Sequence, residues 1–216
     1  MKEMIRRNKL PLYFALTLLI GWTPWVMERG YVVFAAPTIS ALIMAYLTEG
    51  RDGLRAIWTR LTSWRASPLF WVVALLMPAL TSILALGTHF LVGGTLPSFP
   101  LANNPVMMAL TFVMFLIPWQ SSAFMEEVGF RGYALEEVQK KWGPLKGTLV
   151  LGFFFGAWLL PEFFRAGSAQ QALGIEYYPW FIITEMGFSI IMTWVYNKSQ
   201  KSSLISGVVM HAAMNF

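Results

Sequence analysis

Two glutamates and an arginine stand close together in the stretch FMEEVGFRGYALEEV at residues 124–138, inside a long apolar run. Glu127 and Arg131 are four residues apart, so on a helix they share a face and can neutralise each other. Glu126 points about 100° away from that face. An ionised side chain at mid-bilayer costs roughly 2.5–3.5 kcal/mol, so buried charges are normally paired, neutralised or functional. We interpret Glu127 and Arg131 as a structural pair and Glu126 as free for chemistry. The alternative is an ion network of all three residues that only locks the helices.

A second polar pair lies near the end of the sequence, in MHAAMNF, where His211 and Asn215 are again four residues apart. Both side chains can donate hydrogen bonds into a helix bundle. A packed, hydrogen-bonded histidine without a chemical role is the alternative. At a rise of 1.5 Å per residue, Glu126 lies roughly 15 Å below the inner membrane surface and His211 roughly 12 Å. The two polar motifs are therefore predicted to meet in one pocket.

Other polar residues are weaker candidates. Glu162 and Glu185 are expected to face a water-filled cavity or an interface, and His89 lies near the outer end of a span. The sequence has no HExxH helix, no GxSxG elbow and no phosphate-binding P-loop. It contains no cysteine and two histidines, which excludes disulfides, thiolate metal sites, a cysteine nucleophile and a histidine-rich metal cage.

The composition indicates a protein of the lipid bilayer. Of the 216 residues, 56% are hydrophobic and 12% are charged, whereas a soluble domain is about 25% charged. The length predicts a single membrane domain over residues 1–216 with little room for a soluble module. The net charge of +5 is interpreted through the placement of the basic residues and not as a nucleic-acid-binding surface.

Apolar stretches predict an all-α, polytopic transmembrane helix bundle with about seven spans, since each crossing needs roughly 17–25 residues. The fourth stretch is too long for a simple span, so part of it must tilt or extend out of the bilayer. The segment near 53–65 is predicted as an amphipathic interfacial helix, with an ordinary connector as the alternative. The expected spans are 10–26, 30–48, 68–92, 105–136, 144–164, 177–196 and 203–216.

Basic residues gather in alternate loops. Arg29 and Arg165 are each the single basic residue of their loop. The segments with several basic residues contain Lys2, Arg6, Arg7 and Lys9; Arg51, Arg55, Arg60 and Arg65; Lys140, Lys141 and Lys146; and Lys198 and Lys201. Because loops rich in Lys and Arg stay cytoplasmic, the N-terminus is predicted inside, as an uncleaved first helix, and the C-terminus outside. The pocket is then predicted in the cytoplasmic half.

These motifs resemble those of the CPBP family of intramembrane proteases, also called the Abi or CAAX-protease-like family, which includes the type II CAAX prenyl endopeptidase. The EExxxR motif appears as Glu126, Glu127 and Arg131, and the HxxxN motif as His211 and Asn215. The resemblance covers about residues 105–216. Either motif alone is weak, whereas both together at this spacing are specific.

One departure from the family pattern concerns its middle motif, FxxxH. The corresponding stretch is FFFGAWLLPEFF at residues 153–164, and alignment on its Trp-x-Leu-Pro part puts Leu159 where the family has histidine. Leucine cannot hold a water, and loss of an acid–base or positioning group costs on the order of 10²–10⁴ in rate. The resemblance therefore leaves three readings: a natural pseudoprotease, an engineered substitution, or a variant that uses another group, with Glu162 as a weak candidate.

The resemblance implies a membrane-embedded endopeptidase in which Glu126 is the general base, Glu127 and Arg131 support it, and His211 and Asn215 stabilise the oxyanion. No cofactor is expected, since Glu126, His211 and Asn215 make a thin ligand set for a divalent metal. The implied partners are the lipid bilayer and a peptide or lipidated protein, with no nucleic acid. The implied location is the plasma membrane of a prokaryote.

Two alternatives from other classes stay open. A catalytically inactive member could use the same pocket to bind a peptide or lipidated protein, for instance in an immunity or scaffold role. A transporter could line its path with these charges, although no inverted repeat is evident in the sequence.

Overall fold

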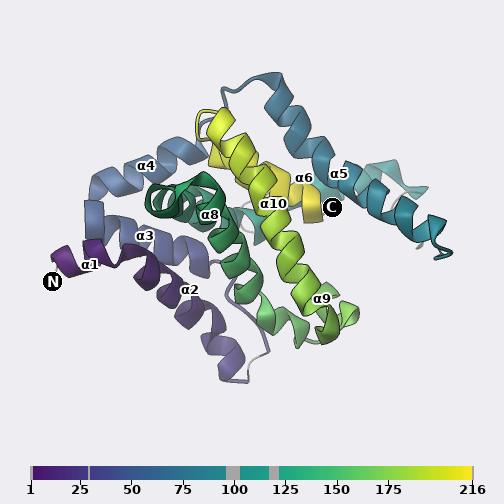
Figure 1. Ribbon diagram of the computed structural model, residues 1–216, viewed down its shortest axis with the longest axis horizontal. Helices are drawn as coiled ribbons and strands as arrows, with labels where there is room; N and C mark the ends of the chain where they lie inside the picture. The colour runs from purple at the N-terminus through teal and green to yellow at the C-terminus, as the bar shows by residue number, and fades with distance from the viewer. Residues whose placement is uncertain (1, 29, 96–102, 117–121, 216) are drawn as a thin grey trace.

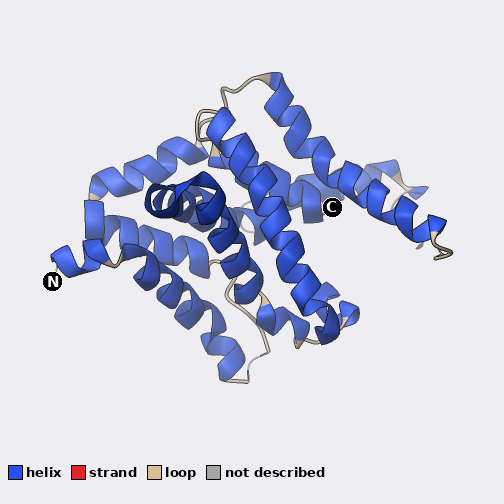
Figure 2. Ribbon diagram, in the orientation of Figure 1, coloured by secondary structure: helices blue, strands red, loops and turns tan. Residues whose placement is uncertain are grey.

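The computed structural model describes residues 2–28, 30–95, 103–116 and 122–215. Every regular element in these ranges is helical, in agreement with the predicted all-α class (Figure 2). Arg29, which contributes to the predicted topology, lies outside the described residues, as do residues 117–121 of the predicted fourth span.

Two π-helical turns adjoin the polar motifs. In chain order the helical elements are α1 (Lys2–Arg7), α2 (Lys9–Val26), α3 (Ala36–Glu49), α4 (Arg51–Leu61), α5 (Pro68–Leu91), α6 (Pro105–Leu116), α7 (Ser122–Gly129), the π-helical η2 (Phe130–Ala134), α8 (Leu135–Trp158), the 3-10 turn η3 (Leu160–Phe163), α9 (Ala169–Leu173), the 3-10 turn η4 (Ile175–Tyr177), α10 (Tyr178–Lys198), the π-helical η5 (Leu204–Val209) and α11 (Met210–Asn215).

The predicted span 105–136 is not a single helix. Its described part is divided between α6 and the continuous run α7–η2–α8, and this run continues through residues 137–143, which were predicted to be a loop. The chain bends later, at Gly143, whose φ of 76° and ψ of 171° suit glycine. Pro144 follows and begins the next helical stretch with its preset φ.

Two other predicted boundaries shift. The helix predicted over 30–48 begins at Ala36, where a proline at the next position starts the first turn. The amphipathic helix predicted near 53–65 is α4, which begins after Gly50 and ends at Leu61. Gly50 has a φ of 68°, so the chain turns between α3 and α4 at a residue that tolerates this conformation.

Helices α8 and α10 lie side by side at the centre of the molecule (Figure 1). Gly152 and Gly156 are one turn apart on α8 and face α10. A Cβ atom at Gly152 would lie 2.7 Å from the Cα of Met186, and one at Gly156 would lie 3.1 Å from the Cα of Ile182. Small residues spaced in this way let two helix backbones approach closely. This contact fixes the face of α10 that meets the polar motifs.

Helix α5 presents apolar side chains outward. The side chains of Leu76, Ile83 and Leu84 are 60%, 64% and 59% exposed. Within the described ranges, α5 is the one helix whose length and hydropathy suffice for a membrane crossing; Leu204–Asn215 is apolar but shorter. An exposed apolar surface of this kind marks a lipid or protein contact.

Ion pairs hold the start of α8 to neighbouring segments. Lys9 of α2 forms an ion pair with Glu137, and Lys201 forms one with Glu136 at 3.0 Å. Arg60 on α4 donates a hydrogen bond of 2.7 Å to a backbone carbonyl oxygen of η2. A π-helical turn breaks the regular bonding of an α-helix, so a carbonyl in it can accept a bond from outside. These contacts anchor the segment that carries Arg131.

Candidate active site

Each polar motif adjoins a π-helical turn. Glu126 and Glu127 lie on α7 and Arg131 follows in η2, while His211 is the second residue of α11, which follows η5 directly. Gly207 in η5 packs against α7, where a Cβ atom would lie 3.0 Å from the Cβ of Glu127. The missing side chain lets the two motif helices touch. Single π-helical turns inside α-helices are frequent at functional sites.

Glu127 joins the two motifs. Its Oε1 accepts a hydrogen bond of 2.8 Å from Nη1 of Arg131, the predicted pair one turn away. The same oxygen lies 2.9 Å from Nδ1 of His211. Glu127 is fully buried, so this contact replaces water that the carboxylate lost on folding. Glu127 is thus the bridge between the EExxxR and HxxxN motifs.

Arg131 also reaches a third helix. Its Nη2 donates a 2.9 Å hydrogen bond to Oγ of Ser189 on α10. The guanidinium lies over the ring of Phe155, 5.4 Å from the ring centroid, and the same ring packs edge-on against His211. An aromatic face attracts a cation and excludes water around it. Arg131 is therefore held by α7, α8 and α10 together.

Glu126 is buried and only loosely engaged. Its side chain is 2% exposed, and its Oε2 lies 3.9 Å from Nδ1 of His211. Among the residues that the structure describes, this oxygen has no hydrogen-bond partner. Buried polar atoms without a hydrogen-bond partner are rare. A buried carboxylate with an unpartnered oxygen is therefore a candidate for chemistry or for binding water. The geometry agrees with the division of roles between Glu126 and Glu127.

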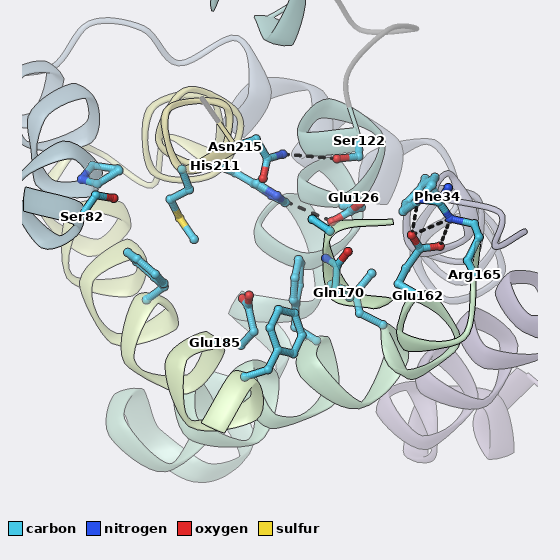
Figure 3. A pocket seen from close by; sticks show the side chains of 17 residues that line it. Phe34, Ser82, Ser122, Glu126, Glu162, Arg165, Gln170, Glu185, His211 and Asn215 are labelled. Atoms are coloured by element: carbon cyan, nitrogen blue, oxygen red, sulfur yellow. Dashed lines mark hydrogen bonds and ion pairs between the residues drawn. The ribbon is translucent and has the colours of Figure 1, made fainter. Parts of the chain in front are cut away.

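A cavity of about 560 Å³ brings the candidates together (Figure 3). Glu126 and His211 both line it, as the depth estimate predicts. Asn215 lines it as well, and its amide donates a long, 3.4 Å hydrogen bond to Ser122. Glu185 reaches the cavity from α10, across from Asn215 and Ser122 (Figure 3). Polar and ionisable groups from α7, α10 and α11 therefore face one space.

Leu159 lies on the wall of this cavity. It follows directly after Trp158, the last residue of α8, and it lines the same space as Glu126 and His211 with a side chain that is 7% exposed. Its side chain has no polar atom to offer. Glu162, one turn further, is bound by Arg165 through contacts of 2.6 to 3.0 Å. The carboxylate of Glu162 is therefore occupied and not free to replace a histidine.

The sequence analysis missed one residue of the site and rated another only as a weak candidate. Ser189 was missed entirely, although a serine four residues after Glu185 on an apolar helix marks a polar stripe. Glu185 was predicted to face a cavity or an interface, and it lines the cavity. The bond between Glu127 and His211 joins residues 84 positions apart and has no local signal in the sequence.

The described residues contain no group of three or more His, Cys, Asp or Glu side chains placed to hold a metal ion. The chemistry that these side chains can perform by themselves is acid–base catalysis by a carboxylate, with hydrogen-bond donors from His211 and Asn215 nearby. This donor set suits attack of water on a carbonyl group.

The segment that carries all of these groups matches a known family. Residues 107–216 match the family described as type II CAAX prenyl endopeptidase Rce1-like. The chain belongs to this family. It also resembles CAAX prenyl protease 2 of Methanococcus maripaludis, with 30% identity over 147 residues, which are 67% of this chain and 53% of that protein. The chain therefore spans about half the length of this curated relative.

All the cavity's motif residues lie within the Rce1-like match, from Glu126 to Asn215, and so does Leu159. The expected family core of 105–216 differs from the matched segment by two residues at its start. Helices α1 to α5 lie outside the matched segment, although Arg60 of α4 contacts η2 within it. Segments outside the Rce1-like core thus support the site.

Proposed function

We propose that this chain is an intramembrane endopeptidase that cleaves a peptide bond with water activated by Glu126. The observation that carries the proposal is the shared cavity, in which a loosely engaged carboxylate faces two potential oxyanion donors, His211 and Asn215. The Rce1-like family membership supports a peptide bond as the target.

The reaction begins at Glu126. Its carboxylate takes a proton from water while the water oxygen forms a bond to the peptide carbonyl carbon, and the carbonyl electron pair moves onto its oxygen. Collapse of this tetrahedral intermediate breaks the C–N bond, and the nitrogen leaves as an amine after taking up a proton. General base catalysis of this kind contributes about 10²–10⁴ in rate.

Glu127 orients His211 and favours the protonated form that can donate to the oxyanion. Oε1 of Glu127 already accepts from Arg131, so Nδ1 of His211 acts as donor to the same oxygen. The remaining ring nitrogen, Nε2, can donate to an oxyanion only in the imidazolium form, which the adjacent Glu127 carboxylate favours. Asn215 supplies a second donor from one turn along α11. Donors aimed at developing charge in a dry site are usually the largest catalytic contribution.

The substrate that we propose is a peptide or lipidated protein. The relative's name refers to a CAAX prenyl protease, and a membrane pocket suits a chain that carries a lipid. We also propose a polytopic membrane domain over residues 1–216, with about seven spans, a cytoplasmic N-terminus and the cavity in the cytoplasmic half. A prokaryotic plasma membrane fits this arrangement.

The test is cleavage of internally quenched peptides by the full chain in proteoliposomes, with a farnesylated Cys-aliphatic-aliphatic-X peptide and its unprenylated twin. Glu126→Gln is expected to reduce kcat by about 10²–10⁴. Glu176→Gln, an isosteric change at an exposed residue, is the matched control. Cleavage that survives Glu126→Gln at the parental rate would show that the assigned base is wrong.

A second candidate function is binding without cleavage. The apolar wall at Leu159 favours it, because this position offers no group to hold the attacking water. In that case the parent protein binds the farnesylated peptide but cleaves neither peptide. The Glu126→Gln change then leaves the binding affinity unchanged.

A further inference from the structure

Glu185 is a carboxyl group that the proposed mechanism leaves without a role. It lies on α10 and lines the cavity across from Asn215 and Ser122 (Figure 3). Within the described ranges it forms neither a hydrogen bond nor an ion pair, whereas Glu162, another acidic side chain that lines the cavity, is bound by Arg165. An ionisable residue inside a membrane bundle is expected to be functional.

The position of Glu185 is set by rigid contacts. Ser189, one turn further along α10, accepts the hydrogen bond from Arg131. Gly152 of α8 packs against the backbone and side chain of the same turn, at 2.7 Å from Met186 Cα for an added Cβ. Glu185 is close enough to His211 and Arg131 to interact with them electrostatically. The turn of α10 that carries Glu185 is thus fixed against α8 and Arg131.

The base role proposed for Glu126 decides which carboxyl group of the cluster carries a proton. Glu127 is the carboxylate whose Oε1 contacts both Arg131 and His211. Glu126 has to be ionised to take a proton from water. With Arg131 and the His211 imidazolium as the two positive charges, the cluster is neutral when Glu185 keeps its proton. Carboxyl groups that share a dry site do not all ionise together.

We propose that Glu185 is the general acid of the site and protonates the leaving nitrogen. This inference rests on the proposed peptide hydrolysis and extends it. As the C–N bond breaks, its electron pair goes to nitrogen, which takes the proton of the Glu185 carboxyl group and leaves as an amine. The proton that Glu126 took from water then returns to Glu185 through cavity water. The net reaction is peptide plus water to carboxylic acid plus amine.

The arrangement separates the two proton transfers in space. Glu126 reaches the cavity from α7 and Glu185 from α10, so water can be activated on one side of the peptide group and the leaving nitrogen protonated on the other. Two carboxyl groups with opposite protonation states on either side of a scissile bond are an established acid–base arrangement in hydrolases. Leu159 has no proton to donate, so the proton for the leaving nitrogen comes from Glu185 on α10.

The test compares leaving groups in the full chain reconstituted in proteoliposomes. One substrate is the quenched peptide, and the other joins its acyl part to p-nitrophenol as an ester, whose phenolate leaves without a proton. Glu185→Gln is expected to lower kcat for the peptide by about 10²–10⁴ and for the ester by less than about tenfold, with KM nearly unchanged. Glu176→Gln, isosteric and exposed, is expected to match the parent on both.

A pH profile supplies a readout that a structural role would not move. The charged groups that face the cavity or join its cluster are Glu126, Glu127, Arg131, Glu162, Arg165 and His211. Both substrates need the His211 imidazolium, but only the peptide needs a proton on its leaving group, so the parental rate on the peptide is expected to fall at a lower pH than the rate on the ester. Glu185→Gln is expected to remove this difference between the two profiles, and Glu185→Asp, which keeps a carboxyl group, to keep it with a lower kcat, which provides a test if the Gln variant does not fold.

The outcomes separate this inference from the proposed function. Equal losses on peptide and ester, or an unchanged difference between the peptide and ester pH profiles in Glu185→Gln, would overturn the role of Glu185 while Glu126→Gln still abolishes cleavage. A parent that cleaves neither substrate overturns both proposals. If the parent cleaves the peptide and Glu185→Gln cleaves it at the same rate, only the general-acid role of Glu185 is overturned.

Discussion

Glu127 and His211 meet through a 2.9 Å contact between Oε1 and Nδ1, although 84 residues separate them in the chain. The same oxygen accepts from Arg131, so one buried carboxylate holds two partners on different helices. This shared oxygen couples the geometry of α7, η2 and α11. The prediction that follows concerns removal of its charge.

Glu127→Gln is expected to destabilise the protein by about 3–5 kcal/mol, because it leaves Arg131 as an uncompensated buried charge. Thermal unfolding in detergent, followed by tryptophan fluorescence, measures the change, with Glu176→Gln as the exposed control. Adding Arg131→Met should recover part of the loss, since residues in one buried network couple by about 0.5–3 kcal/mol. Additive losses in the double variant would contradict a direct pair.

Ser189→Ala is expected to lower stability by about 1–3 kcal/mol, because Nη2 of Arg131 loses its buried acceptor. Thr184→Ala is a matched control on the same helix, where an exposed hydroxyl bonds only to the carbonyl one turn before. Comparison of the two unfolding temperatures tests the contact. Equal effects of the two changes would show that Ser189 does not hold the guanidinium.

Gly152→Ala is expected to separate α8 from α10, since the new Cβ would lie 2.7 Å from the Cα of Met186. Overpacking of this kind costs typically about 1–3 kcal/mol, and displacement of α10 should also lower cleavage. Gly187→Ala is the control, because a Cβ there meets nothing within 4 Å. A variant at Gly152 that unfolds at the same temperature as the Gly187 variant would rule out the close backbone approach.

Leu159→His places an imidazole on the cavity wall beside Glu126 and His211. If the parent lacks a group to position water, kcat for the quenched peptide should rise by about 10²–10⁴. Leu159→Met, which keeps the wall apolar and nearly the same volume, should leave kcat unchanged. A parent that already cleaves as fast as the histidine variant would remove the binding-only alternative.

Sequence reasoning succeeded where the signal is local. The spacing of Glu127 and Arg131 predicts their ion pair, and the structure confirms it at 2.8 Å. The spacing of His211 and Asn215 places both on one face, and both line the cavity. The sequence predicted separate spans over 105–136 and 144–164 with a basic connection between them, whereas the helix continues to Gly143, where the chain bends. A glycine's φ depends on its context and not only on its neighbours in sequence.

The sequence by itself determined the helical class, the two polar motifs and the family to which their spacing points, since helical periodicity and hydropathy act over a few residues. Only the tertiary structure decided that Glu127, and not Glu126, bonds His211, that Ser189 receives Arg131 and that Glu185 faces the cavity without a partner among the described residues. These contacts depend on close helix approaches at Gly207 and Gly152. Such approaches arise from packing between distant segments, which no local pattern encodes.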